Sequence, residues 1–217
     1  MTTIQHHLTG DLLMAYSAGT LPEAFSLVVA THISMCDECR AQLAEFDAVG
    51  GKLIETMEMS DVSDDAFAAT LALIAANSDM EPAAAPEVKK PGLFPAPLRQ
   101  WVGGDMEAVH WRSVGGGVSQ MVIQTSGQET VRLLRIPGGV AVPDHGHSGT
   151  ELTLVLQGAF RDESARFGAG DIEVADEDIE HTPVAELGAD CICLAATDAR
   201  LRFKGLVPRI AGRVMGI

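Results

Sequence analysis

Residues 139–158, "GVAVPDHGHSGTELTLVLQG", decide the fold of the larger part of this chain. His145 and His147 are two positions apart, so on an extended strand both side chains point to the same face. Glu151 follows and adds a carboxylate, and imidazole with carboxylate suits a divalent transition metal. A further ligand is expected from a later strand, where "GDIEVADEDIEHTP" contains His181. We therefore predict a metal site of three histidines and one glutamate in a β domain.

The same stretch resembles the first cupin motif, G-x5-H-x-H-x3-E-x6-G, at every fixed position, with Gly139 and Gly158 as its glycines. The resemblance implies a jelly-roll β-barrel with the metal site inside. The later segment departs from the family pattern: "ADE" at 175–177 replaces the usual Pro-x-Gly, and Ala185 stands where an asparagine is frequent. This departure weakens the expectation of enzyme geometry more than that of metal binding. The alternative is a metal-free barrel that retains its histidines.

A second candidate site lies in "THISMCDEC", residues 31–39. His32 falls in the last turn of an expected helix, and Cys36 and Cys39 lie about one helical turn apart at the start of the next. Tetrahedral zinc needs one more ligand. His6 and His7 are the histidines within reach, and we favour His7 with the register left open. The alternative is a buried thiol pair beside an incidental histidine.

Composition divides the chain into two parts. Residues 1–85 hold 13 Asp and Glu against Arg40 and Lys52 and contain four of the 22 glycines. Five of the ten prolines lie in residues 80–97, which predicts an extended linker. We therefore expect a helical zinc-binding domain at 1–85, a proline-rich linker at 86–98 and a β domain at 99–217.

Four helices are expected before the linker. The first follows Thr9 as a cap and ends before Gly19, and the second opens at Pro22. A third begins near Asp37, turns Leu43, Phe46 and Leu53 inward, and has a weak point at Gly50–Gly51. The fourth, "SDDAFAATLALIAAN" at 63–77, is strongly apolar. Its larger side chains either dock on a partner or pack within the chain: Phe67, Leu71, Leu73 and Ile74.

The order of the two parts carries a further resemblance. "HISMCDEC" with an upstream histidine is similar to the zinc-binding anti-sigma domain, and such a domain followed by a cupin resembles the ChrR family of anti-sigma factors. The segments "FSLVVATH", "GAFRDE" and "DCICLAATDA" are also similar to that family. The resemblance implies that the helical domain inhibits an extracytoplasmic-function sigma factor. It further implies that the cupin domain is needed to release this partner under singlet oxygen or organic hydroperoxide stress.

Several function classes are disfavoured. The net charge of −15 repels nucleic acid and anionic membranes but suits a basic protein partner. The first Lys or Arg is Arg40, so the start of the chain lacks the charged region of a signal peptide, and no apolar run approaches the ~20 residues of a membrane span. We expect a cytoplasmic non-enzyme with a structural zinc, a second divalent metal in the cupin domain for which zinc is favoured, and no small-molecule substrate.

Two alternatives stay open at this point. The chain could be a metal-dependent cupin enzyme of the dioxygenase type whose helical domain is regulatory. It could also be a thiol switch in which Cys36 and Cys39 oxidise and expel zinc. A second thiol pair, Cys191 and Cys193, is expected to pack in the barrel wall rather than to sense oxidants.

Overall fold

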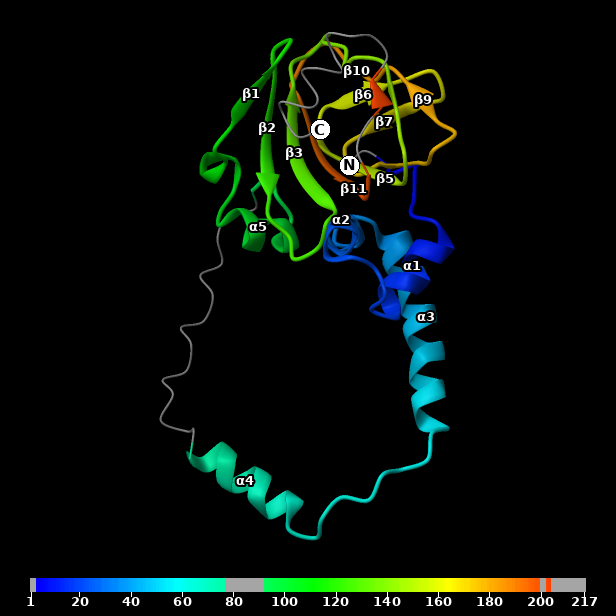
Figure 1. Ribbon diagram of the computed structural model, residues 1–217, viewed down its shortest axis with the longest axis vertical. Coiled ribbons are helices and arrows are strands. Elements are labelled where there is room, and N and C mark those ends of the chain that lie inside the picture. Colours follow the sequence, from blue (N-terminus) through cyan, green and yellow to red (C-terminus); the bar gives the residue numbers. More distant parts are fainter. Residues whose placement is uncertain (1–2, 77–91, 200–201, 204–217) are drawn as a thin grey trace.

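The computed structural model describes residues 3–76 and 92–199, together with the backbone of 202–203 (Figure 1). Its helices are α1 Gly10–Ser17, α2 Glu23–Ile33, α3 Asp37–Glu55, α4 Ala66–Ala76, α5 Ala96–Val102 and the short 3-10 helix η1 Met106–Ala108. Its strands are β1 Arg112–Gly115, β2 Val118–Ile123, β3 Thr130–Ile136, β4 His145–Gly146, β5 Glu151–Gln157, β6 Ala159–Arg161, β7 Arg166–Gly168, β8 Ile172–Ala175, β9 Glu180–His181, β10 Val184–Ala185, β11 Cys191–Thr197 and β12 Arg202–Phe203. Within these ranges no helix combines the length and the apolar character that a membrane crossing requires.

Local signals place the first helices where they were predicted. The Thr9 side chain accepts a hydrogen bond from the Leu12 amide at 3.4 Å, and Gly19, just beyond α1, has a φ of 67°. Pro22 lies immediately before α2 rather than inside it. The Cys36 sulfur caps α3 by accepting the Cys39 amide at 3.4 Å. A candidate metal ligand therefore also defines the start of a helix.

The second half of the chain forms an antiparallel β domain. One sheet has six strands in the order β1-β2-β3-β11-β5-β8, and two three-stranded sheets, β10-β6-β7 and β12-β4-β9, complete it. The pairing of β4 with β9 sets His145 opposite His181. Glu151 is the first residue of β5. The topology thus brings three of the predicted ligands to one end of the domain although they are far apart in sequence.

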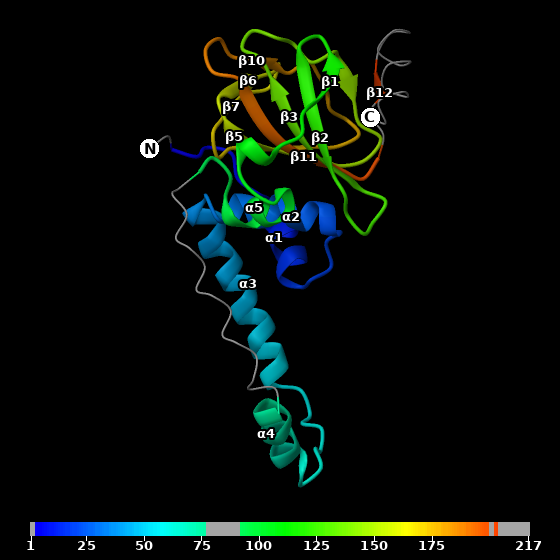
Figure 2. The same ribbon diagram turned by 90° about the vertical axis from the view of Figure 1, so that its left-hand side faces the viewer.

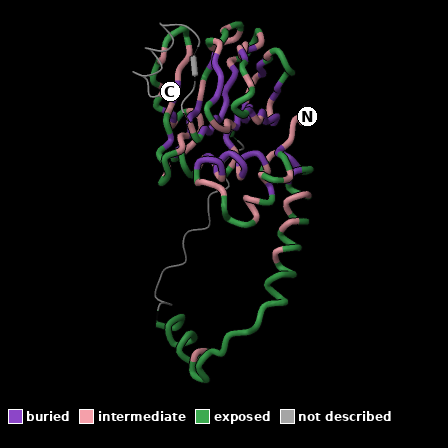
Figure 3. Tube along the Cα trace, turned by 45° about the vertical axis from the view of Figure 1, so that its right-hand side comes forward, coloured by how far each residue is buried: buried purple, intermediate pink, exposed green. Residues whose placement is uncertain are grey.

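Helix α2 lies directly against the large sheet, with α5 beside it (Figure 2). It is buried on nearly every side, which is the pattern of a helix inside a core rather than on a surface. Its Phe25 and Val28 belong to the same hydrophobic cluster as Leu152 and Leu194 of the sheet. Figure 3 shows this continuous buried region passing from the helices into the strands. The two parts therefore share one core, and their separation into independent domains remains a prediction.

The predicted linker at 86–98 differs from the structure at its described end. Residues 77–91, which include most of its first half, lie outside the described residues. Residues 96–98 are helical rather than extended, because α5 begins at Ala96. Phe94 and Leu98 are fully buried in the shared core. The proline content does not indicate an extended linker at this end, because Pro95 and Pro97 lie at the start of a helix, a position that proline tolerates.

The outer half of α3 and the whole of α4 lie away from this core (Figures 1 and 3). Leu43 and Phe46 are packed against the core as predicted. Leu53 was predicted to face inward and does not, since it is 64% exposed on the part of α3 that extends beyond α1. The helix also continues through Gly50–Gly51 to Glu55. Helix α4 has no buried residue.

Candidate metal centres

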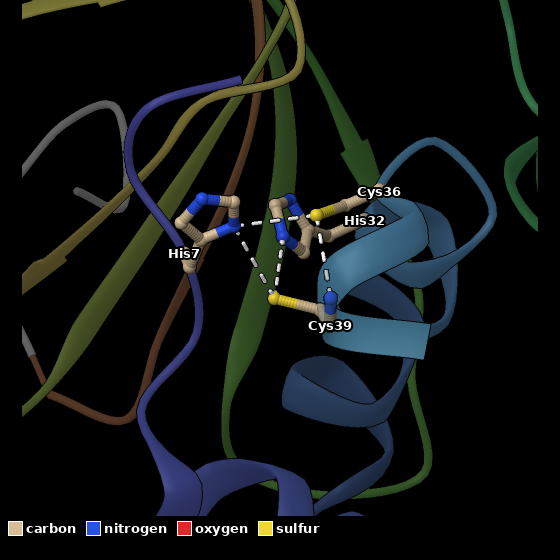
Figure 4. Close-up of side chains that lie close together, drawn as sticks. All are labelled: His7, His32, Cys36 and Cys39. Atoms are coloured by element: carbon tan, nitrogen blue, oxygen red, sulfur yellow. Dashed lines mark hydrogen bonds between the residues drawn. The ribbon is translucent and has the colours of Figure 1, made fainter. Parts of the chain in front are cut away.

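The first candidate site joins three segments of the helical part (Figure 4). His32 comes from the last turn of α2, and Cys36 and Cys39 come from the start of α3. His7 approaches from the extended segment that precedes α1. His6, the alternative left open by the sequence, does not join this group, because its ring lies 4.4 Å from that of Phe167. The structure thus brings together His7, His32, Cys36 and Cys39.

The donor atoms of this cluster have the spacing of a tetrahedral zinc site. All four lie within 4.8 Å of one another. The His32 Nε2 to Cys39 Sγ distance is 3.3 Å, and His7 Nδ1 lies 3.3 Å from Cys36 Sγ and 3.7 Å from Cys39 Sγ. Ligands at zinc bond lengths are separated by about 3.3–3.8 Å in a tetrahedron. The cluster therefore suits zinc in donor type, and three of its donor separations match those of a tetrahedral site.

The electrostatics of this cluster favour a cation. Burial lowers the pKa of His32 to about 4, so the imidazole is neutral and able to donate its lone pair. Burial raises the pKa of the Cys39 thiol to about 11, so a thiolate there needs a compensating positive charge. His7 Nε2 lies 3.4 Å from a Glu38 carboxylate oxygen, an outer contact typical of metal-bound histidines.

The second candidate site is formed by His145, His147 and His181. His181 Nε2 lies 3.2 Å from His145 Nε2 and 3.2 Å from His147 Nε2. Three imidazole nitrogens converge at nearly the separation, about 3.3 Å, that tetrahedral zinc would impose. All three side chains are buried, at 1–3% relative exposure. This convergence fits a divalent metal held by three histidines.

Outer contacts fix the orientation of two of these rings. His145 Nδ1 lies 2.8 Å from the Pro143 carbonyl, so the Nδ1 proton is donated there and Nε2 is left toward the cluster. His181 Nδ1 lies 3.0 Å from a Glu173 oxygen and 3.1 Å from an Asp162 oxygen. Burial lowers the pKa of His181, but the bonds to the two carboxylates outweigh it and raise this pKa to about 9.

Glu151 stands at the edge of this cluster. Its carboxylate lies 3.7 Å from His147 Nδ1 and accepts a hydrogen bond from the Thr153 hydroxyl at 3.0 Å. The converging nitrogen group itself consists of the three histidines. Burial raises the pKa of Glu151 to about 7, opposed by the Thr153 bond, and a bound cation would favour the ionised form. Its part as the fourth ligand therefore remains a prediction.

Sequence reasoning did not find the carboxylates around His181. Asp162 lies just after β6 and Glu173 lies on β8, and both face His181 from outside the histidine cluster. A signal was available, because an acidic residue at an inward-facing strand position needs a partner. Without the strand order, however, this pattern does not identify His181 as the partner of the two carboxylates.

Comparison with known proteins identifies the chain's relatives. Residues 99–200 match a family model described as the ChrR cupin-like domain. The chain is 57% identical over 208 residues to the anti-sigma-E factor ChrR of Cereibacter sphaeroides, an alignment that covers 96% of both chains. The chain belongs to the ChrR family of anti-sigma factors.

A solved relative supports the same assignment for the fold. A crystal structure of Rhodobacter sphaeroides SigE in complex with the anti-sigma ChrR contains a chain 57% identical to this one. The two superpose with a TM-score of 0.80 over 90% of this chain and 100% of that chain. The predicted fold, a small helical domain with a His/Cys cluster followed by a cupin barrel, is thereby confirmed.

In this ChrR-family chain the second thiol pair is sealed in the barrel. Cys191 and Cys193 lie on β11 with their sulfurs 3.5 Å apart, and both are fully buried. The neighbouring thiol and burial together raise the pKa of Cys193. They pack with Val155, Phe160 and Phe167 in a separate apolar cluster. This placement agrees with the expected packing role.

Proposed function

We propose that this chain is a cytoplasmic anti-sigma factor that binds and inhibits an extracytoplasmic-function sigma factor and releases it under oxidative stress, from singlet oxygen or organic hydroperoxide. The observation that carries the proposal is the 57% identity with an anti-sigma-E factor along 96% of both chains. The solved ChrR relative is in complex with SigE, which supports a sigma factor as the partner of this chain too.

The exposed apolar surface of the outer helices supports a protein partner. Phe67, Leu73 and Ile74 of α4 are at least 60% exposed, and Leu71 is about half exposed. Exposed apolar side chains concentrated on one helix indicate an interaction site more often than a free surface. Of the two alternatives left by the sequence, docking on a partner is favoured, since the described part of the chain buries none of α4. A helix of this kind suits a groove on the sigma factor.

Charge supports the same partner class. Residues 1–85 are strongly acidic, with 13 Asp and Glu against two basic residues. A sigma factor presents basic surfaces that otherwise face DNA, so the acidic helices would attract it and compete with nucleic acid. Direct binding of nucleic acid or of an anionic membrane by this chain is disfavoured for the same reason.

The two clusters are proposed to have different roles. Zinc at His7, His32, Cys36 and Cys39 would tie the extended N-terminal segment to the start of α3 and stabilise the helical part. A divalent metal at His145, His147, His181 and Glu151, for which zinc is favoured, would serve release of the partner rather than inhibition. Inhibition is thus assigned to residues 1–85 and the response to the cupin part, 99–217.

Enzymatic activity is the competing function, because three histidines with an adjacent carboxylate can also hold a catalytic metal. The 57% identity with an anti-sigma factor along 96% of both chains argues against it. Metal analysis and an oxygen-uptake screen of the purified chain separate the two. A redox-active metal with turnover would favour the enzyme.

Reporter transcription tests the proposed division of roles. Full-length chains carrying His145→Ala, His147→Ala, Glu151→Ala or His181→Ala are expressed with the cognate sigma factor and a dependent promoter. We expect each variant to repress as the wild type does and to lose induction by singlet oxygen. Variants that repress and still respond fully would refute a sensing role for the cupin metal. Loss of repression would refute the division into separate roles.

A further inference from the structure

The N-terminal strap, defined here as residues 4–7, is held by the cupin domain along residues 4–6. The backbone amides of Gln5 and His6 donate to Asp171 Oδ1 at 2.6 and 3.0 Å. The Ile172 amide donates to the His6 carbonyl at 3.3 Å. At Gly170 an added Cβ would lie 2.6 Å from Ile4, so the strap and the β7–β8 turn are in close contact. The strap thus lies beside the edge strand β8 and hydrogen-bonds with its first residue, Ile172.

The His6 side chain adds to this attachment. Its Nε2 lies 3.1 Å from the Arg166 carbonyl, and its ring rests against Phe167. Both partners belong to β7. The residue that immediately follows His6 is His7, whose Nδ1 lies 3.3 Å from Cys36 Sγ. The position of one ligand of the His/Cys cluster is therefore set by β7 and the turn that connects it to β8.

Asp171 is the central contact of this attachment. It is only 5% exposed, and its second oxygen accepts the Gly168 amide at 2.8 Å. One buried carboxylate therefore binds three backbone amides, two from the strap and one from the last residue of β7.

The series of contacts that begins at the strap also reaches the cupin cluster, which consists of His145, His147 and His181. Glu173 lies on β8, two residues after Asp171, which immediately precedes the strand, and it contacts His181 Nδ1 at 3.0 Å. Residues two apart on a strand point to the same side, so a shift of the strand at Glu173 is transmitted to Asp171 over a short rigid segment. A continuous series of contacts therefore runs from His181 through β8 to the strap and His7.

We infer that Asp171 is a positioning residue that couples the cupin cluster to the His/Cys cluster by way of β8 and the strap. This inference rests on the proposed function, because a signal received in the cupin domain must alter the part of the chain that holds the partner. An oxidant-induced change at His181 that displaces Glu173 would move Asp171, loosen the amides of residues 5 and 6, and free His7 from its cluster. The two clusters then respond as one unit.

Hydrogen exchange on the zinc-loaded full-length chain tests the coupling. Asp171→Asn places an amide donor against the Gly168 or strap amides, and we expect exchange at residues 5 and 6 to rise about tenfold or more. Release of zinc from the His/Cys cluster to a chromogenic chelator should accelerate as well. Glu173→Gln, which leaves Asp171 intact, should raise the same exchange rates. The double variant should not exceed Asp171→Asn alone, since both act through one connection.

Asp176→Asn serves as the matched control, because Asp176 is an exposed carboxylate just beyond the same strand. It should leave exchange and zinc release unchanged. The inference would be overturned if Glu173→Gln left the exchange rates at residues 5 and 6 within twofold of wild type. This measurement is decisive even if Asp171→Asn does not fold. Effects that multiply in the double variant would overturn it too. Titration of wild type with the sigma factor separates the two proposals: failure to bind contradicts the proposed function and leaves the coupling measurement intact.

Discussion

Shortening one exposed side chain of α4 should weaken partner binding without destabilising the chain. Phe67 is 75% exposed, so Phe67→Ala removes little buried surface and should change the free energy of unfolding by less than ~0.5 kcal/mol. Full burial of a phenylalanine contributes about 1.5–3 kcal/mol, and three quarters of that, roughly 1–2 kcal/mol, remains for a partner. The expected increase in Kd for the sigma factor is therefore about 5- to 30-fold.

Two measurements check this expectation. Calorimetric titration of the zinc-loaded full-length chain with purified sigma factor gives Kd, and urea unfolding gives stability. Leu187→Ala is the matched control, because Leu187 is 89% exposed but lies in the cupin domain. It should change neither quantity. A Phe67→Ala variant that binds within twofold of wild type but unfolds at lower urea would show that α4 packs within the chain, and the assignment of this helix to the partner would be wrong.

Three further outcomes are expected. Cys36→Ser should reduce bound zinc by about one ion per chain and lower Tm, as measured by elemental analysis and thermal unfolding, whereas Cys191→Ser should leave the zinc content unchanged. Zinc binding at pH 7 should release at least one proton, because the pKa of Cys39 is about 11 in the metal-free chain; a binding enthalpy that is independent of the buffer would contradict this. Phe94→Ala should lower the free energy of unfolding by ~3–5 kcal/mol in urea, since Phe94 is fully buried in the shared core, and a change under ~1 kcal/mol would contradict its assignment to that core.

Both clusters could be located from sequence because their spacing is local. His145 and His147 lie on one face of one short segment, and His32, Cys36 and Cys39 lie within eight residues. Helix ends were equally local, as at Thr9 and Gly19. The choice of His7 over His6 was harder, because adjacent residues of an extended segment point to opposite sides. Only the docking of His6 on Phe167 settles which ring faces the cysteines.

What sequence could not supply depends on contacts between distant residues. Asp171 and Gln5 are 166 positions apart, and nothing in either segment indicates that they meet. Leu53 is exposed because α3 is longer than α1 and extends beyond it. The spacing of apolar residues in α3 does not reveal this difference in length. The proline-rich segment that contains Phe94 predicts a linker, although Phe94 is buried in the core shared by the helices and the sheet. Tertiary packing overrode the local pattern in each case.

The packing of α2 against β11 has a consequence for the order in which the chain is made. The ribosome delivers α2 early, but β11, on which α2 rests, ends at Thr197. At about 5–20 residues per second, roughly 10–30 s pass between the emergence of His32 and that of β11. Throughout this interval the side of α2 that packs against β11 in the folded chain has no β11 to contact. The time needed to complete the folded protein is thus set by translation from α2 through β11, and faster transcription cannot shorten it.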